Sequence, residues 1–185
     1  GITTLIGVSG QKGSFTPAIL GDLAKNTERP IVFALSNPTS CSETTPQEVL
    51  DATEGRAIVA TGSPFAPARL PDGRPLPASQ CNNLYVFPGM GLGAITGQAS
   101  RITHRMFHAA ACAISDMVTA EQRRDGLLLP PLTDIRAVSY RVALAVAMEA
   151  RDEGLGMIAS DEELGARIAA SMWQPRYYPY RYCPS

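Results

Sequence analysis

Three asparagines stand where their side chains could bind a small polar ligand. Asn37 comes just after the apolar run 31–35, and Asn82 and Asn83 directly precede the apolar segment 84–87. A side-chain amide offers a donor and an acceptor without adding charge, so it can bind a carboxylate, a hydroxyl or a carboxamide. The ordinary alternative is that each amide braces its own backbone in an Asx-turn. The residues by themselves leave both interpretations open.

Two glycine-rich turns could bring backbone N–H groups close to a ligand. The first contains Ser9 and Gly10 and has the pattern G-x-x-G-x-x-G over residues 7–13. Its amides could face a phosphate or a ribose, or the glycines could simply supply positive φ angles. The second, residues 89–94, matches G-x-G-x-x-[GA] but follows a proline and opens no strand–helix–strand unit. We interpret its glycines as sites of close helix packing.

The sequence contains no pattern for metal binding, nucleophilic catalysis or acid–base catalysis. His104 and His108 are four residues apart on a predicted helix, but there is no H-E-x-x-H pattern and no third ligand in register. We interpret both as surface or interface histidines. No nucleophile motif and no acid–base pair is present, so we predict no catalytic and no metal-binding residue in this chain.

The first third of the chain alternates strands with helices. We predict strands at residues 4–8, 31–35 and 57–60, with helices starting after Thr16 and after Thr45. The short connections imply parallel strands with right-handed crossovers, buried on both faces. The fold class is therefore α/β, a parallel sheet followed by a helical C-terminal segment.

The rest of the chain is expected to be mostly helical. Residues 61–84 are expected to be a long loop and residues 85–87 a short strand. Helices are predicted at 92–100, 105–118, 119 onward, 135–153 (capped by Asp134) and 161–173 (capped by Ser160). The segment 138–150 is apolar nearly all round, so we expect part of its packing partner to lie outside the chain. The tail, residues 174–182, is expected to pack along another surface.

Composition bounds the class of protein. The 185 residues carry a formal net charge of -1, which argues against nucleic acid and anionic membranes as partners. Cys41, Cys81, Cys112 and Cys183 form no C-x-x-C pair, so we expect reduced thiols in a cytoplasmic protein. The chain begins inside a strand pattern without a methionine, and we expect it to be a piece of a longer protein.

Five stretches of the chain resemble the malic enzyme family in their order and spacing. They are residues 29–39 (RPIVFALSNPT), 54–57 (EGRA), 61–65 (TGSPF), 82–89 (NNLYVFPG) and 129–132 (LPPL). The end of the chain, with WQP at 173–175 and a tail rich in Tyr and Arg, resembles the NAD-linked bacterial type. The resemblance covers essentially the whole chain.

The resemblance implies a division into three parts. Residues 1–84 would be the C-terminal half of an NAD(P)-binding Rossmann-like domain, with the elements β-α-β-α-β in chain order. Residues 85–155 would be a helical segment that packs on a substrate and metal domain absent from this chain. Residues 156–185 would be a C-terminal helix with the Tyr/Pro/Arg tail.

The resemblance also implies a reaction. Malic enzymes oxidise L-malate at C2 with NAD or NADP and a divalent metal, and release pyruvate and CO2. The residues implied to bind malate are Asn37, Asn82 and Asn83. Those implied to line the dinucleotide crevice are Ser9, Gly10, Asn37, Gly62 and Ser63. A homo-oligomer is also implied.

Two departures from the family pattern matter. Cys81 stands where many relatives have a glycine before the two asparagines. Its side chain is expected to leave a ligand less room to reach the two asparagine amides. The family's tyrosine acid, lysine base and carboxylate ligands for Mg2+ or Mn2+ have no counterpart here, so we predict that the chain alone is inactive. A malolactic enzyme, or a non-catalytic regulatory or assembly module, remains an alternative.

Overall fold

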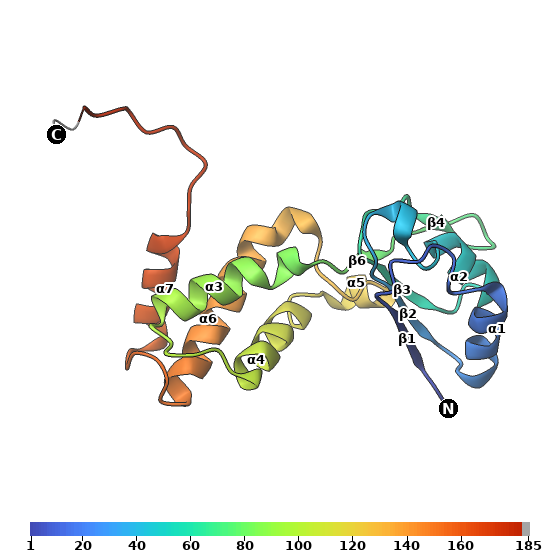
Figure 1. Ribbon diagram of the computed structural model, residues 1–185, viewed down its shortest axis with the longest axis horizontal. Coiled ribbons are helices and arrows are strands. Elements are labelled where there is room, and N and C mark those ends of the chain that lie inside the picture. Colours follow the sequence, from blue (N-terminus) through green and yellow to red (C-terminus); the bar gives the residue numbers. More distant parts are fainter. Residues whose placement is uncertain (183–185) are drawn as a thin grey trace.

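The computed structural model describes residues 1–182 as a sheet part followed by a helical part (Figure 1). Four strands form one parallel sheet in the order β1 (Thr4–Gly7), β2 (Ile31–Ala34), β3 (Ile58–Thr61) and β6 (Ser79–Gln80). The predicted fold class, a parallel α/β sheet with helices after it, is confirmed.

The two helices that cross between the first three strands begin where the sequence predicts. Thr16 caps α1 (Pro17–Asn26) through the Ile19 amide, and a capping box starts α2 (Pro46–Ala52). Each helix has a proline in its first turn, where the missing N–H costs nothing. Local chemistry alone therefore sets both start points.

One face of the sheet is a packed core. Leu5, Val32 and Val59 are partners in the strand register and lie on the same face. They pack against Leu20 of α1 and Val49 of α2, both fully buried. This face holds the two helices in place.

The opposite face is largely open. Ile6 of β1 is 58% exposed, and Ile31 and Phe33 of β2 are only half-buried. Ile2 and Val8, which flank β1, are exposed as well. The prediction that the strands are buried on both faces is wrong for β1 and β2, since α1 and α2 pack on the same face, but in β3 successive residues on both faces, Val59 and Ala60, are buried.

Residues 61–84 contain more structure than the predicted loop. A hairpin, β4 (Ala68–Arg69) with β5 (Pro75–Leu76), precedes β6. Two-residue strands carry no readable hydrophobic period, so the sequence could not reveal them.

The strand predicted at residues 85–87 is wrong. The segment forms a short 3-10 turn, η2 (Asn83–Tyr85), followed at once by α3 (Phe87–Thr96) with Pro88 in its first turn. The apolar run there reflects burial of Tyr85, whose hydroxyl donates to the Pro130 carbonyl at 2.5 Å.

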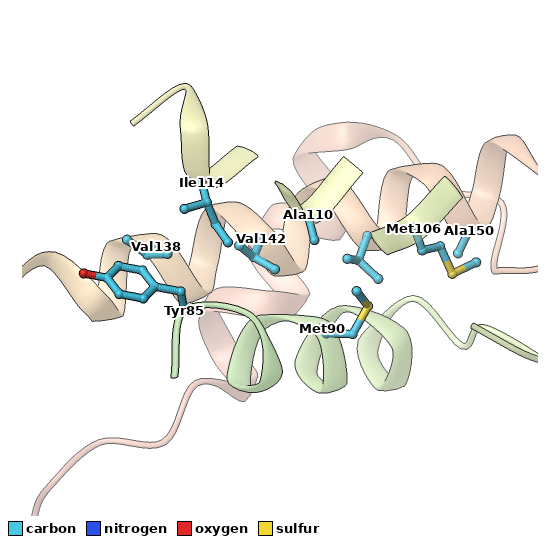
Figure 2. Packing of buried hydrophobic residues seen from close by; sticks show 9 residues of the cluster. Tyr85, Met90, Met106, Ala110, Ile114, Val138, Val142 and Ala150 are labelled. Carbon is cyan, nitrogen blue, oxygen red and sulfur yellow. The ribbon is translucent and has the colours of Figure 1, made fainter. Parts of the chain in front are cut away.

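The helical part is built around α6 (Ile135–Asp152). It packs with α3 and with α4 (His104–Ser115) through a buried core seen in Figure 2. On another side α6 packs against α7 (Asp161–Ser171) through Ala143, Ala147, Leu164 and Ile168. Most of the apolar surface of α6 is thus buried within this chain, and most of the rest of its apolar side chains are half-buried. Whether the helical part also packs on another domain stays a prediction, as do the three predicted boundaries.

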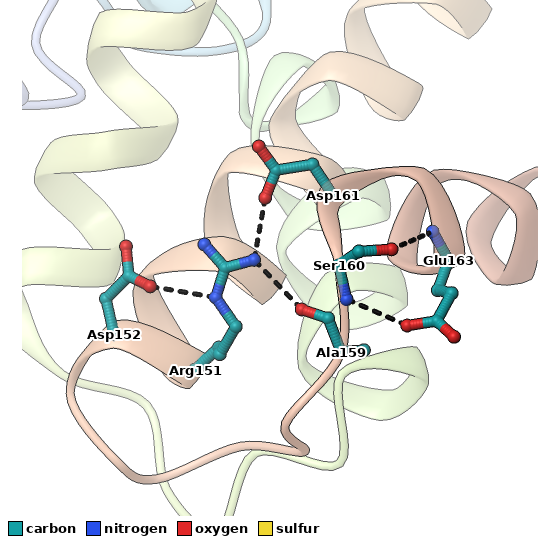
Figure 3. A network of polar contacts seen from close by, with 6 residues as sticks. All are labelled: Arg151, Asp152, Ala159, Ser160, Asp161 and Glu163. Atoms are coloured by element: carbon teal, nitrogen blue, oxygen red, sulfur yellow. Dashed lines mark hydrogen bonds and ion pairs between the residues drawn. The ribbon is translucent and has the colours of Figure 1, made fainter.

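The connections at the two ends of α6 differ. At its start, Asp134 occupies the predicted N-cap position but its side chain makes no capping hydrogen bond, and a 3-10 turn, η3 (Leu132–Asp134), leads into the helix. At its end, Arg151 donates to the Ala159 carbonyl at 3.0 Å and to Asp161 at 2.6 Å (Figure 3). Ser160 forms the predicted cap of α7. Arg151 therefore ties the start of α7 to the end of α6.

The remaining segments pack less tightly against the rest of the chain. The short helix α5 (Ala120–Arg124) starts with the predicted capping box at Thr119. After α7 the chain runs away from the other elements as an extended arm (Figure 1), with Tyr177 and Tyr180 exposed. That this tail packs along another surface stays a prediction. No helix within residues 1–182 has the length and apolar character to cross a membrane.

Close packing of α3 on α6 depends on two of the three alternating glycines. A Cβ added at Gly93 would lie 2.4 Å from the Ala143 carbonyl oxygen, and one at Gly89 would lie 2.6 Å from the Val142 Cβ. At Gly91 no neighbour lies within 4 Å. Close helix packing is therefore confirmed for Gly89 and Gly93, and it is wrong for Gly91.

This difference predicts that alanine has opposite effects on stability at two positions of one helix, Gly91 and Gly93. Gly93→Ala should lower the free energy of unfolding by about 1–3 kcal/mol, because α3 must move away from α6. Gly91→Ala should leave it unchanged or raise it by up to about 1 kcal/mol through helix propensity. Urea unfolding of both variants measures this, and equal effects would contradict the packing argument.

The open face of the sheet predicts self-association of this chain. Sedimentation velocity should show a concentration-dependent shift to larger species, because contiguous exposed apolar surface promotes association. Ile6→Lys should shift the distribution toward monomer. Ile158→Lys is the control, since Ile158 is 97% exposed but lies between α6 and α7. A monomer at every concentration would contradict the prediction.

Candidate functional site

The four parallel strands end at one edge of the sheet, and backbone hydrogen bonds continue the pairing just past each end. The Leu35 amide donates to Gly7, the Gly62 amide to Ala34 and the Cys81 amide to Thr61, at 2.8–3.0 Å. The turns that follow β1, β2, β3 and β6 are therefore fixed side by side. In open parallel sheets this edge is where ligands bind.

Asn37 and Ser63 are joined across this edge. The Ser63 hydroxyl donates to the Oδ1 of Asn37, and the Ser63 carbonyl accepts from Thr61 at 2.9 Å. A Cβ at Gly62 would lie 2.1 Å from the Leu35 carbonyl oxygen, so the two turns approach this closely only because residue 62 is glycine. Asn37 is exposed, and its amide nitrogen has no partner within residues 1–182.

The two neighbouring asparagines differ from each other. The Oδ1 of Asn82 accepts from the Leu84 amide at 3.0 Å, which is an Asx-turn that starts η2. Its nitrogen reaches the Gly62 carbonyl at 3.4 Å. Asn83 is exposed, and in the described part of the chain its side chain makes no hydrogen bond. The bracing interpretation is thus correct for the Asn82 oxygen, and Asn83 presents a free amide.

Ser9 and Gly10, after β1, are held by a carboxylate that the sequence argument missed. Glu43 accepts from the Ser9 amide at 2.7 Å and from the Ser9 hydroxyl at 2.9 Å. It also accepts from the Ser36 hydroxyl at 2.5 Å, and that hydroxyl accepts from the Gly10 amide at 2.8 Å. Ser9 and Gly10 are therefore tied to the turn that carries Asn37.

Glu43 is charged in this setting. Burial by itself raises its pKa, but the hydrogen bonds from Ser36 and Ser9 outweigh burial and lower the pKa from 4.5 to about 2. No motif marks Glu43 in the sequence, where it is an isolated glutamate in the connection before α2. The nearest signal is Gly7, since glycine at the end of a strand often marks a close approach.

The two histidines lie apart from this edge. His104 and His108 are exposed on α4, where His108 Nε2 is 3.6 Å from the Cys112 sulfur. Within residues 1–182, no three potential metal ligands gather. Cys41, Cys81 and Cys112 are free thiols, and Cys183 lies outside the described residues. Burial raises the pKa of Cys81, which keeps the thiol beside Asn82 neutral.

Comparison with known proteins agrees with this geometry. The family model described as "Malic enzyme, NAD binding domain" matches residues 2–151. The chain belongs to the malic enzyme family. An NAD-dependent malic enzyme of Pseudomonas aeruginosa (strain UCBPP-PA14) is 50% identical over 179 residues, 97% of this chain and 32% of the relative. That of Sodalis glossinidius is 48% identical with the same coverage.

Solved malic enzymes have the same fold over most of this chain. The structure from Pyrococcus horikoshii is 28% identical, has a TM-score of 0.68 and covers 91% of this chain and 34% of that protein. The structure from Entamoeba histolytica is 25% identical, has a TM-score of 0.72 and covers 92% and 32%. The chain thus spans about a third of the length of the malic enzymes it matches, and it includes a Rossmann-like NAD-binding domain fold.

The lowered pKa of Glu43 predicts how stability depends on pH. The folded chain keeps Glu43 ionised below pH 4.5, where the unfolded chain binds a proton, so its contribution to stability is complete above 4.5 and is lost as the pH falls toward 2. Glu43→Gln should therefore destabilise the chain most near neutral pH. Urea unfolding at several pH values measures this. A difference between the two proteins that stays constant down to about pH 2 would contradict it.

Proposed function

We propose that this chain supplies part of the dinucleotide and malate site of an NAD-dependent malic enzyme. The reaction is oxidation of L-malate at C2, followed by decarboxylation to pyruvate and CO2. The observation that carries the proposal is the row of joined turns after β1, β2, β3 and β6, which gathers the serines, glycines and asparagines singled out in the sequence as ligand-binding candidates. The naming of the P. aeruginosa and S. glossinidius relatives as NAD-dependent favours NAD over NADP.

The residues at this edge fit a dinucleotide and a small dicarboxylate. The turns with Ser9–Gly10 and Gly62–Ser63 bring the backbone to the carboxyl edge, where a nicotinamide dinucleotide binds in this fold class. Asn37 lies between them with its amide nitrogen directed to no protein acceptor within residues 1–182. It can therefore donate to a carboxylate, a hydroxyl or the nicotinamide carboxamide.

We further assign different roles to Asn82 and Asn83. The oxygen of Asn82 is occupied by the Leu84 amide, so this residue sets the start of η2. Asn83, the first residue of that turn, keeps a free and exposed side chain. Asn83 is therefore the better candidate to contact malate, and Asn82 positions it.

The remaining chemistry belongs outside the described residues. NAD, when bound, accepts the hydride from C2 of malate. The proton-transfer groups and the ligands of Mg2+ or Mn2+ are proposed to come from elsewhere in the longer enzyme. A homo-oligomer, a cytoplasmic location and the absence of nucleic-acid and membrane partners are part of the same proposal, supported by the resemblance and by the near-neutral charge.

A chimera tests the proposal. This chain replaces the matching 179 residues of the P. aeruginosa enzyme, and the chimera should reduce NAD in the presence of malate and Mn2+. The isolated chain should show no such activity. Asn37→Ala in the chimera should lower kcat/KM for malate by about 10- to 100-fold, because a hydrogen bond to a charged ligand is lost.

The matched control is Asn26→Ala. Asn26 ends α1, and in the described part of the chain its side chain hydrogen-bonds only to the Asp22 carbonyl, so its loss should leave the kinetics unchanged. Unchanged kinetics in Asn37→Ala, or a folded chimera that does not oxidise malate, would overturn the proposal.

A further inference from the structure

A buried carboxylate joins the first two turns of the site. Glu43 is 0% exposed and lies in the connection between the 3-10 turn η1 (Thr39–Cys41) and α2. From there its side chain reaches back to the carboxyl ends of both β1 and β2. No sequence motif and no part of the proposed reaction accounts for it.

The carboxylate accepts four hydrogen bonds from these two turns. Two come from Ser9, through its amide at 2.7 Å and its hydroxyl at 2.9 Å. Two come from Ser36, through its hydroxyl at 2.5 Å and its amide at 3.3 Å. The Gly10 amide joins the network through the Ser36 hydroxyl at 2.8 Å.

The backbone around Glu43 makes room for this arrangement. A Cβ at Gly7 would lie 2.6 Å from Cγ of Glu43 and 2.6 Å from Cζ of Phe15, so the Glu43 side chain lies directly over the Gly7 Cα. The Phe15 amide donates to the Glu43 carbonyl at 3.1 Å. The side chain is thus held by close packing as well as by its hydrogen bonds.

We propose that Glu43 is a positioning residue, which sets the geometry of the Ser9–Gly10 turn and of Asn37 for dinucleotide binding. It touches neither the dinucleotide nor malate, and it acts through Ser9 and Ser36. The inference rests on the proposed function, because it assumes that these turns meet the dinucleotide.

The role requires a group that only accepts hydrogen bonds. A carboxylate presents two acceptor oxygens, whereas the amide of glutamine turns one of them into a donor. In Glu43→Gln that donor would face either the Ser9 amide together with the Ser9 and Ser36 hydroxyls, which share one oxygen, or the Ser36 amide, which meets the other oxygen. The turn with the mismatched donors must move away, although side-chain size is preserved.

Kinetics of the chimera test the inference. Glu43→Gln should raise the KM for NAD by about tenfold or more, because a displacement of about 1 Å at a binding turn has effects of this size. A purely structural role would reduce the fraction of folded enzyme, which lowers the apparent kcat and leaves KM unchanged. An unchanged KM for NAD in Glu43→Gln would overturn the inference.

The matched control is Glu48→Gln, five residues away in the first turn of α2. Glu48 closes the capping box of α2 by accepting from the Thr45 amide at 2.8 Å, and glutamine serves equally well at that position. Glu48→Gln should therefore keep both KM values. If it raised the KM for NAD as much as Glu43→Gln does, the effect would not be specific to Glu43 and the inference would be wrong.

Hydrogen exchange in the isolated chain gives a second test that needs no activity. In Glu43→Gln, the Leu20 amide in α1 reports the loss of global stability, and the Ser9 and Gly10 amides should exchange about tenfold faster or more beyond that loss. Unchanged exchange at Ser9 and Gly10 would overturn the inference even if the chimera oxidises malate. An inactive chimera with faster exchange at these amides would instead contradict the proposed function and leave the role of Glu43 in holding the turns supported.

Discussion

The parallel register of the sheet is the constraint on which the site depends. Because β1, β2, β3 and β6 run in the same direction, their ends meet at one edge, and backbone hydrogen bonds extend the register into each following turn. Residues from four separate stretches of the chain are thereby brought into one row. The helices α1 and α2 contribute by clamping one face of the sheet, which fixes the strands against each other.

The strand register sets the approximate positions of the turns, and side-chain hydrogen bonds then fix the turns against one another. Ser63 binds Asn37 between the second and third turns, and Glu43 binds Ser9 and Ser36 between the first and second. Burying a carboxylate is unfavourable unless it is well hydrogen-bonded, and the lowered pKa of Glu43 reflects how completely its oxygens are satisfied. These bonds fix the turns, and within residues 1–182 they leave the Asn37 amide nitrogen and the Asn83 amide without a partner.

Much of this architecture could be predicted from sequence because its signals are local. Caps such as Thr16 and Ser160, and short apolar runs such as 31–35, mark helices and strands wherever they occur. What could not be predicted depends on contacts between distant residues. Glu43 carries no motif, β6 is two residues long, and Gly91 cannot be told from Gly93 until α6 is placed against α3. The site residues could be located at strand ends, but the division of roles between Asn82 and Asn83 required the geometry of η2.

The most direct test of the central claim, that these four turns form one ligand site, is a crystal structure of the full-length chimera with NAD and pyruvate bound. We expect the nicotinamide to lie at the carboxyl edge of the sheet, with the Asn37 amide nitrogen within about 3.2 Å of a ligand oxygen. A dinucleotide bound elsewhere, with this edge free of ligand, would contradict the account.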